Sequence, residues 1–192
     1  MRTSTIERIT NETKVDLVLE LDGVGRGKIK TNIPFFDHML EQLTFHSSVD
    51  LELNVRGDID IDFHHSVEDC GICLGKAFVE ALGDKKGINR YGFFLLPMDD
   101  ALIRVALDFS GRSFLSWKVT FPTNRVGNFD LELVREFFNA FSTNSGATLH
   151  VELLDGLNSH HISEAVFKAM GKSIKMAIEK NKDVEMIPST KG

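Results

Sequence analysis

The sequence lacks the features that mark membrane, secreted and nucleic-acid-binding proteins. Its longest apolar runs are far too short to span a bilayer, and its first residues lack the apolar core of a signal peptide. Lysine and arginine number 22 against 28 aspartates and glutamates, and no basic cluster offsets the net charge of −6. We therefore expect a cytoplasmic protein that binds neither nucleic acid nor membrane.

Cysteine is also scarce, with two residues among 192. Cys70 and Cys73 form a C-x-x-C pattern inside an apolar segment that has helical spacing. A redox site needs a loop position and a zinc site needs more thiols, so the pattern favours two buried free thiols. The rest of the composition, with 42% hydrophobic and 26% charged residues, is that of a globular chain able to bury a core.

Two histidine motifs stand out, H-H-S-V-E at 64–68 and H-H-I-S-E at 160–164. In a helix, the first histidine and the glutamate of each motif share a face, and the second histidine points about 100° away. Each motif could therefore give two ligands to one metal and one ligand to a neighbouring metal. One such motif is weak evidence, because paired histidines also occur on surfaces without function, but two copies predict a paired-metal centre.

The ligand types narrow the choice of metal. Imidazole and carboxylate without thiolate suit manganese, iron or zinc of higher coordination number better than tetrahedral structural zinc. The glutamate position also differs from the H-E-x-x-H motif of zinc proteases.

The predicted elements follow the same order twice. The first half is expected to contain strands at 15–21 and 28–33, a helix at 36–44, a strand at 49–55 and a helix at 64–82. The second half is expected to contain strands at 101–109 and 114–121, a helix at 130–141, a strand at 148–154 and a helix at 160–179. Turn residues at 22–27 predict a hairpin in the first half, and residues 110–112 are expected to form a turn in the second half.

We therefore expect an α+β fold of two tandem pseudo-repeated β-β-α-β-α units, each a sheet with helices packed on one face. The first unit covers 1–83, a joint covers 84–100, and the second unit covers 101–192. Aligning the two short helices places Glu136 opposite His38, which makes both of them candidate additional metal ligands.

Other candidates are weak when taken alone. The glycine-rich segment at 23–28 lacks P-loop spacing and is predicted to be a turn. Arg90 and Arg112 could hold a phosphate, but an isolated arginine is more often structural or solvated. His46 and His150 are expected to be half-buried histidines, and the final residues, 188–192, a frayed tail.

Five segments together resemble one enzyme family over essentially the whole chain. They are F-D-H-M-L at 36–40, G-D-I-D at 57–60 before the first histidine motif, G-R at 111–112, N-S-H-H-x-x-E-A-x-F-K at 158–168, and P-S-T-K-G at 188–192. This set is similar to the imidazoleglycerol-phosphate dehydratases, in their single-function form without an attached phosphatase.

The resemblance implies a hydro-lyase of histidine biosynthesis. It would convert D-erythro-imidazole glycerol phosphate to imidazole acetol phosphate and water through a di-manganese-bound imidazolate, with two Mn²⁺ per active site. It also implies a large homo-oligomer, typically of 24 subunits, with active sites between subunits. The residues alone predict only a paired-metal enzyme and would favour hydrolysis.

The resemblance also implies roles for individual residues. One manganese would take His64, Glu68, His160 and Glu164, and the other would take His38, His65, His161 and Glu136, where many members carry histidine. Substrate contacts would come from Glu12, His38, His46, Arg90, Arg112, Lys168, Ser189, Thr190 and Lys191. Glu12 is the expected proton shuttle, with Glu68 and Glu164 as further catalytic carboxylates.

Two alternatives remain open at this point. A binuclear metallohydrolase would release phosphate from an ester, whereas the dehydratase retains it. A metal-stabilised oligomeric shell without activity would not need Arg90 or Arg112.

Overall fold

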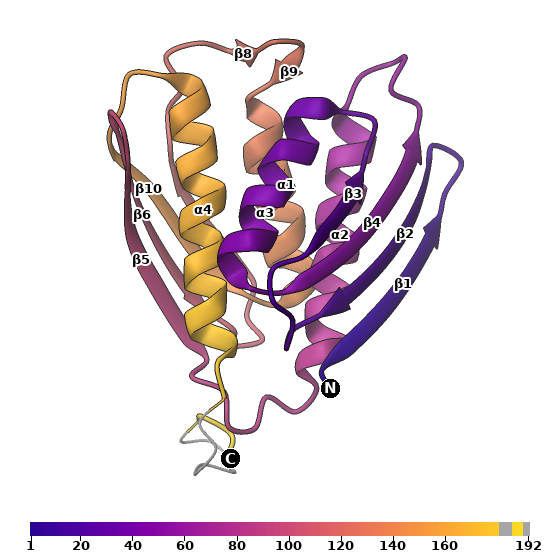
Figure 1. The fold of residues 1–192 in the computed structure, drawn as a ribbon, viewed down its shortest axis with the longest axis vertical. Coiled ribbons are helices and arrows are strands. Elements are labelled where there is room, and N and C mark those ends of the chain that lie inside the picture. Colours follow the sequence, from indigo (N-terminus) through magenta and orange to yellow (C-terminus); the bar gives the residue numbers. More distant parts are fainter. Residues whose placement is uncertain (181–185, 190–192) are drawn as a thin grey trace.

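Two mixed four-stranded sheets face each other across a layer of helices in this computed structural model, which describes residues 1–180 and 186–189 (Figure 1). The first sheet has the spatial order β1 (Thr3–Ile9), β2 (Thr13–Glu20), β4 (Asp50–Gly57) and β3 (Gly27–Lys30). The second has the order β5 (Tyr91–Met98), β6 (Ala101–Asp108), β10 (Thr148–Asp155) and β7 (Phe114–Lys118). Each sheet ends in one parallel pair, so the second repeats the topology of the first, and the α+β prediction is confirmed.

The helices lie between the sheets (Figure 1). They are α1 (Pro34–Ser47), α2 (His64–Leu82), α3 (Glu132–Ser145) and α4 (Ser159–Ile178). Helix α2 packs on β1 and β2, and α4 packs on β5 and β6. In addition, α1 packs against α4 and α2 packs against α3, so helices of the two halves share one hydrophobic core.

Periodicity explains most of these elements. Strand β2 buries Val15, Leu17 and Leu19 on one face, as its alternation predicts. Helix α2 begins at His64 and ends at Leu82, as predicted, and Gly83 follows with a positive φ of 54°.

Two strands were not predicted. Strand β1 buries only Ser4, and β5 carries Pro97 and buries only Gly92 and Leu96. Both are edge strands, and an edge strand with so few buried apolar residues leaves little alternation in the sequence. The range expected to be a joint, 84–100, therefore contains β5. A short ribbon of β8 (Arg125–Val126) and β9 (Phe129–Asp130) was also not predicted.

The hairpin predicted around residues 22–27 is wrong, and the second half has the same parallel arrangement. Strand β3 pairs in parallel with β4, and β7 pairs in parallel with β10. The glycine-rich loop after β2 wraps around the Asp50 carboxylate, which accepts hydrogen bonds from the backbone N–H groups of Val24 and Arg26, both at 2.8 Å. This loop carries the chain past β4 to its far edge.

Glycines permit the closest helix contacts. A Cβ on Gly75 of α2 would lie 2.8 Å from the carbonyl oxygen of Phe141 in α3, and one on Gly171 of α4 would lie 2.7 Å from that of Leu43 in α1. Among the described residues, no helix has both the length and the apolar character needed to cross a bilayer.

Candidate metal and active site

Helices α1 and α4 bring three ligand-type residues together. His38 comes from α1, His160 and Glu164 come from α4, and one ligand atom of each lies within 4.8 Å of the other two. Oε2 of Glu164 is 3.5 Å from Nε2 of His38 and 3.2 Å from Nε2 of His160. Atoms about 2.1 Å from a shared ion lie up to about 4.2 Å apart. Small side-chain movements would therefore close this group, the α1–α4 triad, around a metal.

Local hydrogen bonds fix where the two helices begin. Asn158 caps α4, and its side-chain oxygen accepts from the backbone N–H groups of His160 at 2.9 Å and His161 at 3.3 Å. Pro34 stands in the first turn of α1. Asp37 then holds the preceding segment, accepting from the backbone N–H of Thr31 at 2.8 Å and from its hydroxyl at 2.6 Å.

Glu164 is buried, yet its carboxyl group has favourable partners for its charged form. Nζ of Lys168, one turn along α4, lies 2.7 Å from its Oε1. Burial alone would raise the pKa of Glu164, but the hydrogen bond and charge of Lys168, together with His38 and His160, outweigh burial and lower the pKa. A carboxylate that stays ionised is a competent metal ligand.

The second histidine of each motif points away from the triad. Nδ1 of His65 lies 3.0 Å from the carboxylate of Asp58, and Nδ1 of His161 lies 2.6 Å from that of Asp100. These hydrogen bonds are the main reason that the pKa of each imidazole is raised. A carboxylate on one ring nitrogen is the usual way of orienting a histidine whose other nitrogen binds a metal.

The remaining nitrogen, Nε2, faces an acidic turn in both cases. Nε2 of His65 lies 3.8 Å from Oε1 of Glu12, and Nε2 of His161 lies 3.7 Å from Oδ2 of Asp99. The β1–β2 turn and the β5–β6 turn thus occupy corresponding places beside the two histidine motifs.

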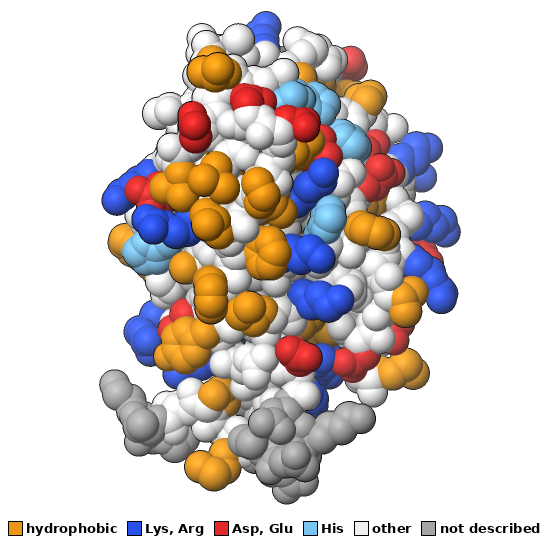
Figure 2. All heavy atoms as spheres, turned by 60° about the vertical axis from the view of Figure 1, so that its left-hand side comes forward, with side chains coloured by type: hydrophobic (Ala, Val, Ile, Leu, Met, Phe, Trp, Pro, Cys, Tyr) orange, Lys and Arg blue, Asp and Glu red, His pale blue; other side chains and the backbone are white. Residues whose placement is uncertain are grey.

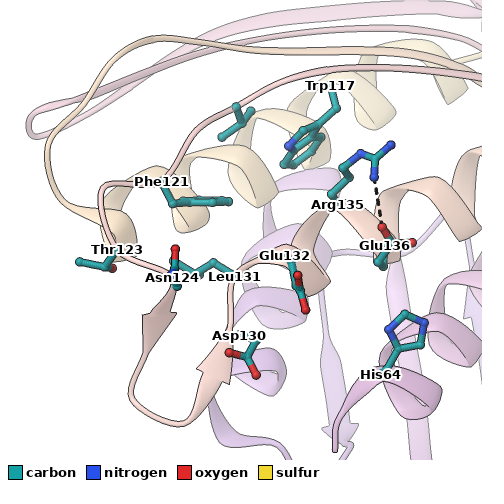
Figure 3. Close-up of a pocket in the computed structure, with 11 residues that line it drawn as sticks. His64, Trp117, Phe121, Thr123, Asn124, Asp130, Leu131, Glu132, Arg135 and Glu136 are labelled. Carbon is teal, nitrogen blue, oxygen red and sulfur yellow. Dashed lines mark hydrogen bonds and ion pairs between the residues drawn. The ribbon is translucent and has the colours of Figure 1, made fainter.

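His64 and Glu136 line a cavity of about 750 Å³ at the start of α2 and α3 (Figure 3). NH1 of Arg135 lies 3.3 Å from the Glu136 carboxylate, and Trp117 and Phe121 form the apolar side of this cavity. Glu68 is exposed one turn after His64 on α2. His64 and Glu68 on α2 correspond to His160 and Glu164 on α4, and Glu136 on α3 corresponds to His38 on α1.

The triad differs from the expected ligand grouping. Within one chain, His38 and not His64 lies with His160 and Glu164, because α1 crosses α4. His38 therefore does not group with His65 and His161 in the chain. Sequence spacing identified the helix face of each ligand but not which helices cross.

The expected phosphate ligands lie elsewhere. Arg90 binds both oxygens of Asp108, at 2.7 and 3.1 Å, and donates to the carbonyl of Pro188 at 2.7 Å. Its backbone N–H donates to the carbonyl of Ala177, which is about 20 Å along α4 from Glu164. Arg112 is exposed beside Asp108. One chain therefore does not bring these arginines to its own triad.

Other expected site residues lie near the triad or outside the described part. His46 on α1 faces Gly171 of α4, and its Nδ1 is buried without a hydrogen-bond partner among the described residues. Burial chiefly lowers the pKa of His46, and the charges of Lys172 and Lys168 add to this effect. Ser189 is described, whereas Thr190 and Lys191 lie outside the described residues.

Of the remaining predictions, that for the cysteines is confirmed and that for His150 is wrong. Cys70 and Cys73 are buried free thiols, as predicted, but His150 is exposed rather than half-buried, because it points outward from β10. Asp58 and Asp100, which hold the second histidines, were missed. Acidic residues following β4 and β5 were the available sequence signal.

Two similar halves around crossing helices, with a nitrogen- and oxygen-donor site at the helix starts, define a metal-binding α+β protein of duplicated topology. Residues 31–174 match the family model described as imidazoleglycerol-phosphate dehydratase. The chain belongs to the imidazoleglycerol-phosphate dehydratase family.

Relatives and solved structures agree over the full length. The chain is 56% identical to the imidazoleglycerol-phosphate dehydratase of Cereibacter sphaeroides, covering 100% of this chain and 99% of the relative. The enzyme of Roseobacter denitrificans is 53% identical with the same coverage. The crystal structure from Staphylococcus aureus superposes with a TM-score of 0.85 at 37% identity, covering 93% of this chain and 99% of the other. The structure from Pyrococcus furiosus, in complex with (S)-C348, has a TM-score of 0.85 at 34% identity, covering 97% and 99%.

Proposed function

We propose that this chain is a manganese-dependent hydro-lyase of histidine biosynthesis, which removes water from imidazole glycerol phosphate and yields imidazole acetol phosphate. The observation that carries the proposal is the α1–α4 triad in a chain that belongs to this family. The donor set fits the metal, since two imidazole nitrogens and one carboxylate oxygen already converge without any thiolate.

Two metal sites follow from the two halves. The first would use the triad. The second would use its counterparts, namely His64 and Glu136, which line one cavity, and Glu68, one turn after His64 on α2. Each set would supply three ligands from one chain. Manganese prefers more, so a histidine from another subunit, His65 or His161, would complete each site.

Exposed apolar surface supports self-association. Tyr91, Phe93 and Leu95 alternate along β5 on its outer face, and each is more than half exposed. Figure 2 shows hydrophobic side chains gathered beside histidine side chains and side chains of lysine or arginine. Apolar patches of this kind on a protein surface commonly mark interfaces. The assembly would be a large homo-oligomer of 24 subunits.

Manganese held by these residues would lower the pKa of the substrate imidazole N–H, and the electron-rich ring would favour loss of the hydroxyl from the adjacent carbon. The hydroxyl would leave as water with the proton that the ring releases. Glu12 would remove the proton from the next carbon and return a proton to the carbon that lost its hydroxyl, giving the ketone. Glu164 and Glu68 would act as further catalytic carboxylates, whose negative charge offsets the positive charge of the metals. His38 and His46 would line the substrate pocket.

The phosphate of the substrate would be held by cations from two chains. Lys168 lies beside the triad. Arg90, Arg112 and the tail residues Ser189, Thr190 and Lys191 would come from another subunit, because Arg90 lies about 20 Å from its own triad along α4. Arginine is well suited to bidentate phosphate binding.

The test is to incubate metal-stripped protein with imidazole glycerol phosphate, with and without manganese, and to assay ketone and free phosphate. Manganese-dependent ketone without phosphate release is expected. Phosphate release without ketone would indicate a metallohydrolase, and the absence of both with fully loaded protein would indicate a metal-stabilised shell.

A further inference from the structure

The β1–β2 turn holds Glu12 by its backbone on both sides. The backbone N–H of Glu12 donates to Oγ1 of Thr10 at 3.1 Å, and its carbonyl accepts from the N–H of Asp58 at 3.1 Å. The Glu12 side chain is 55% exposed and directs Oε1 toward Nε2 of His65. Because Asp58 also binds Nδ1 of His65, the turn and this imidazole are fixed relative to each other.

A buried carboxylate supports this turn from the side of the helix. Asp69, only 5% exposed, directly follows Glu68 on α2. It accepts hydrogen bonds from Nε of Arg8 at 2.8 Å and from Oγ1 of Thr13. The backbone N–H of Thr13 donates at 2.9 Å to Oγ1 of Thr10, the same oxygen that holds the N–H of Glu12. A continuous path of hydrogen bonds thus runs from α2 to Glu12.

We propose that Asp69 is a positioning residue for the dehydration, which sets Glu12 against His65 through Thr13 and Thr10. This inference rests on the proposed function, since it concerns the proposed proton shuttle. Helix α2 would then supply the metal ligands His64, His65 and Glu68 and would also, through Asp69, fix the position of the proton shuttle. Displacing a reacting group by about 1 Å can lower a rate by about 100-fold.

The second half shows that the fold does not require this cluster. Ala165 directly follows Glu164, as Asp69 follows Glu68, and Ala101 begins β6, as Thr13 begins β2. Both alanines are buried. Burying a carboxylate is unfavourable unless its hydrogen bonds are satisfied, and apolar residues often fill such a position with equal or greater stability. A role at Glu12 explains why the first half retains the polar cluster.

The experiment compares Thr13→Val, which keeps the shape but removes the hydroxyl, with Thr13→Ser, which keeps the hydroxyl. Ser4→Ala is the matched control, because the Ser4 hydroxyl on β1 likewise joins the first sheet to α2, by a 2.7 Å hydrogen bond to Glu80. Steady-state kinetics and bound manganese are measured on the full-length, metal-loaded protein.

Thr13→Val is expected to lower kcat by about 10- to 100-fold while KM and bound manganese stay unchanged. Thr13→Ser is expected to stay within about threefold of the unmodified protein, and Ser4→Ala to match it in kcat. In a Glu12→Gln background, Thr13→Val should cause no further loss, because its effect acts through Glu12.

A loss of kcat that multiplies with that of Glu12→Gln would overturn the inference, as would an equal loss in Ser4→Ala. If Thr13→Val does not fold, Asp69→Asn is measured in its place. If neither folds, the cluster serves folding and the inference is wrong. A failure of the proposed function is distinguishable, because the unmodified protein would then form no ketone.

Discussion

The two halves share one topology but differ around their histidine motifs. In the second half, Glu164 is buried with Lys168 one turn along α4 and His38 opposite. In the first half, Glu68 is exposed, and Ile72 stands where Lys168 would be. The first half instead has the Asp69 cluster beside Glu12.

This difference shows how a duplicated fold divides its tasks. The repeated topology places the same ligand types at the same helix positions, so both halves can hold a metal. The residues around the ligands then diverge, with a cation for the substrate phosphate in the second half and a fixed proton shuttle in the first.

Removing one ligand from each half should have the largest effect. His160→Ala and His64→Ala are each expected to reduce bound manganese from two ions to one per chain, measured by elemental analysis. Because Lewis-acid assistance is worth several kcal/mol, turnover should fall by about 1,000-fold or more. Loss of both ions in only one variant would show that the two sites are not equivalent.

Removing the carboxylates that orient the second histidines should have an intermediate effect. Asp58→Asn and Asp100→Asn are each expected to weaken manganese affinity by about 10- to 100-fold, because such partners orient the ligand and raise its basicity. Titration of the apoprotein with manganese measures this change. Asp155→Asn, at the exposed end of β10, serves as a control, since among the described residues its side chain accepts a hydrogen bond only from the adjacent N–H of Gly156.

Two glycine substitutions, one at each helix crossing, form a matched pair with a smaller expected effect. Gly75→Ala and Gly171→Ala both place a Cβ within 3 Å of a backbone carbonyl, so each should lower the free energy of unfolding by about 1–3 kcal/mol. Chemical denaturation measures this loss. Of the two added Cβ atoms, only the one on Gly171 would also meet His46, at 3.0 Å from the His46 Cβ. Gly171→Ala should therefore lower activity in the folded protein, and Gly75→Ala should not.

The cysteines should have the smallest effect. Burial raises the pKa of the Cys73 thiol to about 11, so at pH 8 about one thiol in a thousand is ionised, and thiolate forms only as the pH approaches 11. Native protein at pH 8 should therefore resist iodoacetamide and react once denatured. The second half has Ala169 at the corresponding position, and Cys73→Ala should retain activity. Rapid labelling of the native thiol would contradict this interpretation.

The sequence predicted much of the fold because four strands and four helices bury regular apolar faces. Strands β2, β4, β6 and β10 are central, and their alternation is clear. The edge strands β1 and β5 bury too little to be recognised. The parallel pairing of β3 was missed because the Asp50 contacts that route its loop join residues far apart in sequence.

The candidate site was predictable as a set of residues but not as an arrangement. Helical spacing indicates that His160 and Glu164 share a face, whatever the fold. Which residue faces them depends on the crossing of α1 and α4, which places His38 there. Likewise, only the folded chain shows that Asp69 contacts Thr13, because the two residues are on different elements.

The exchange of helix partners has a consequence for how such a chain arose. Helix α1 packs against α4, and α2 against α3, so each half covers apolar helix faces of the other. An ancestor of half this length would have left those faces in water and would have been stable only when associated with a second copy of itself. Fusion of the two copies makes that association independent of protein concentration and leaves each half free to diverge.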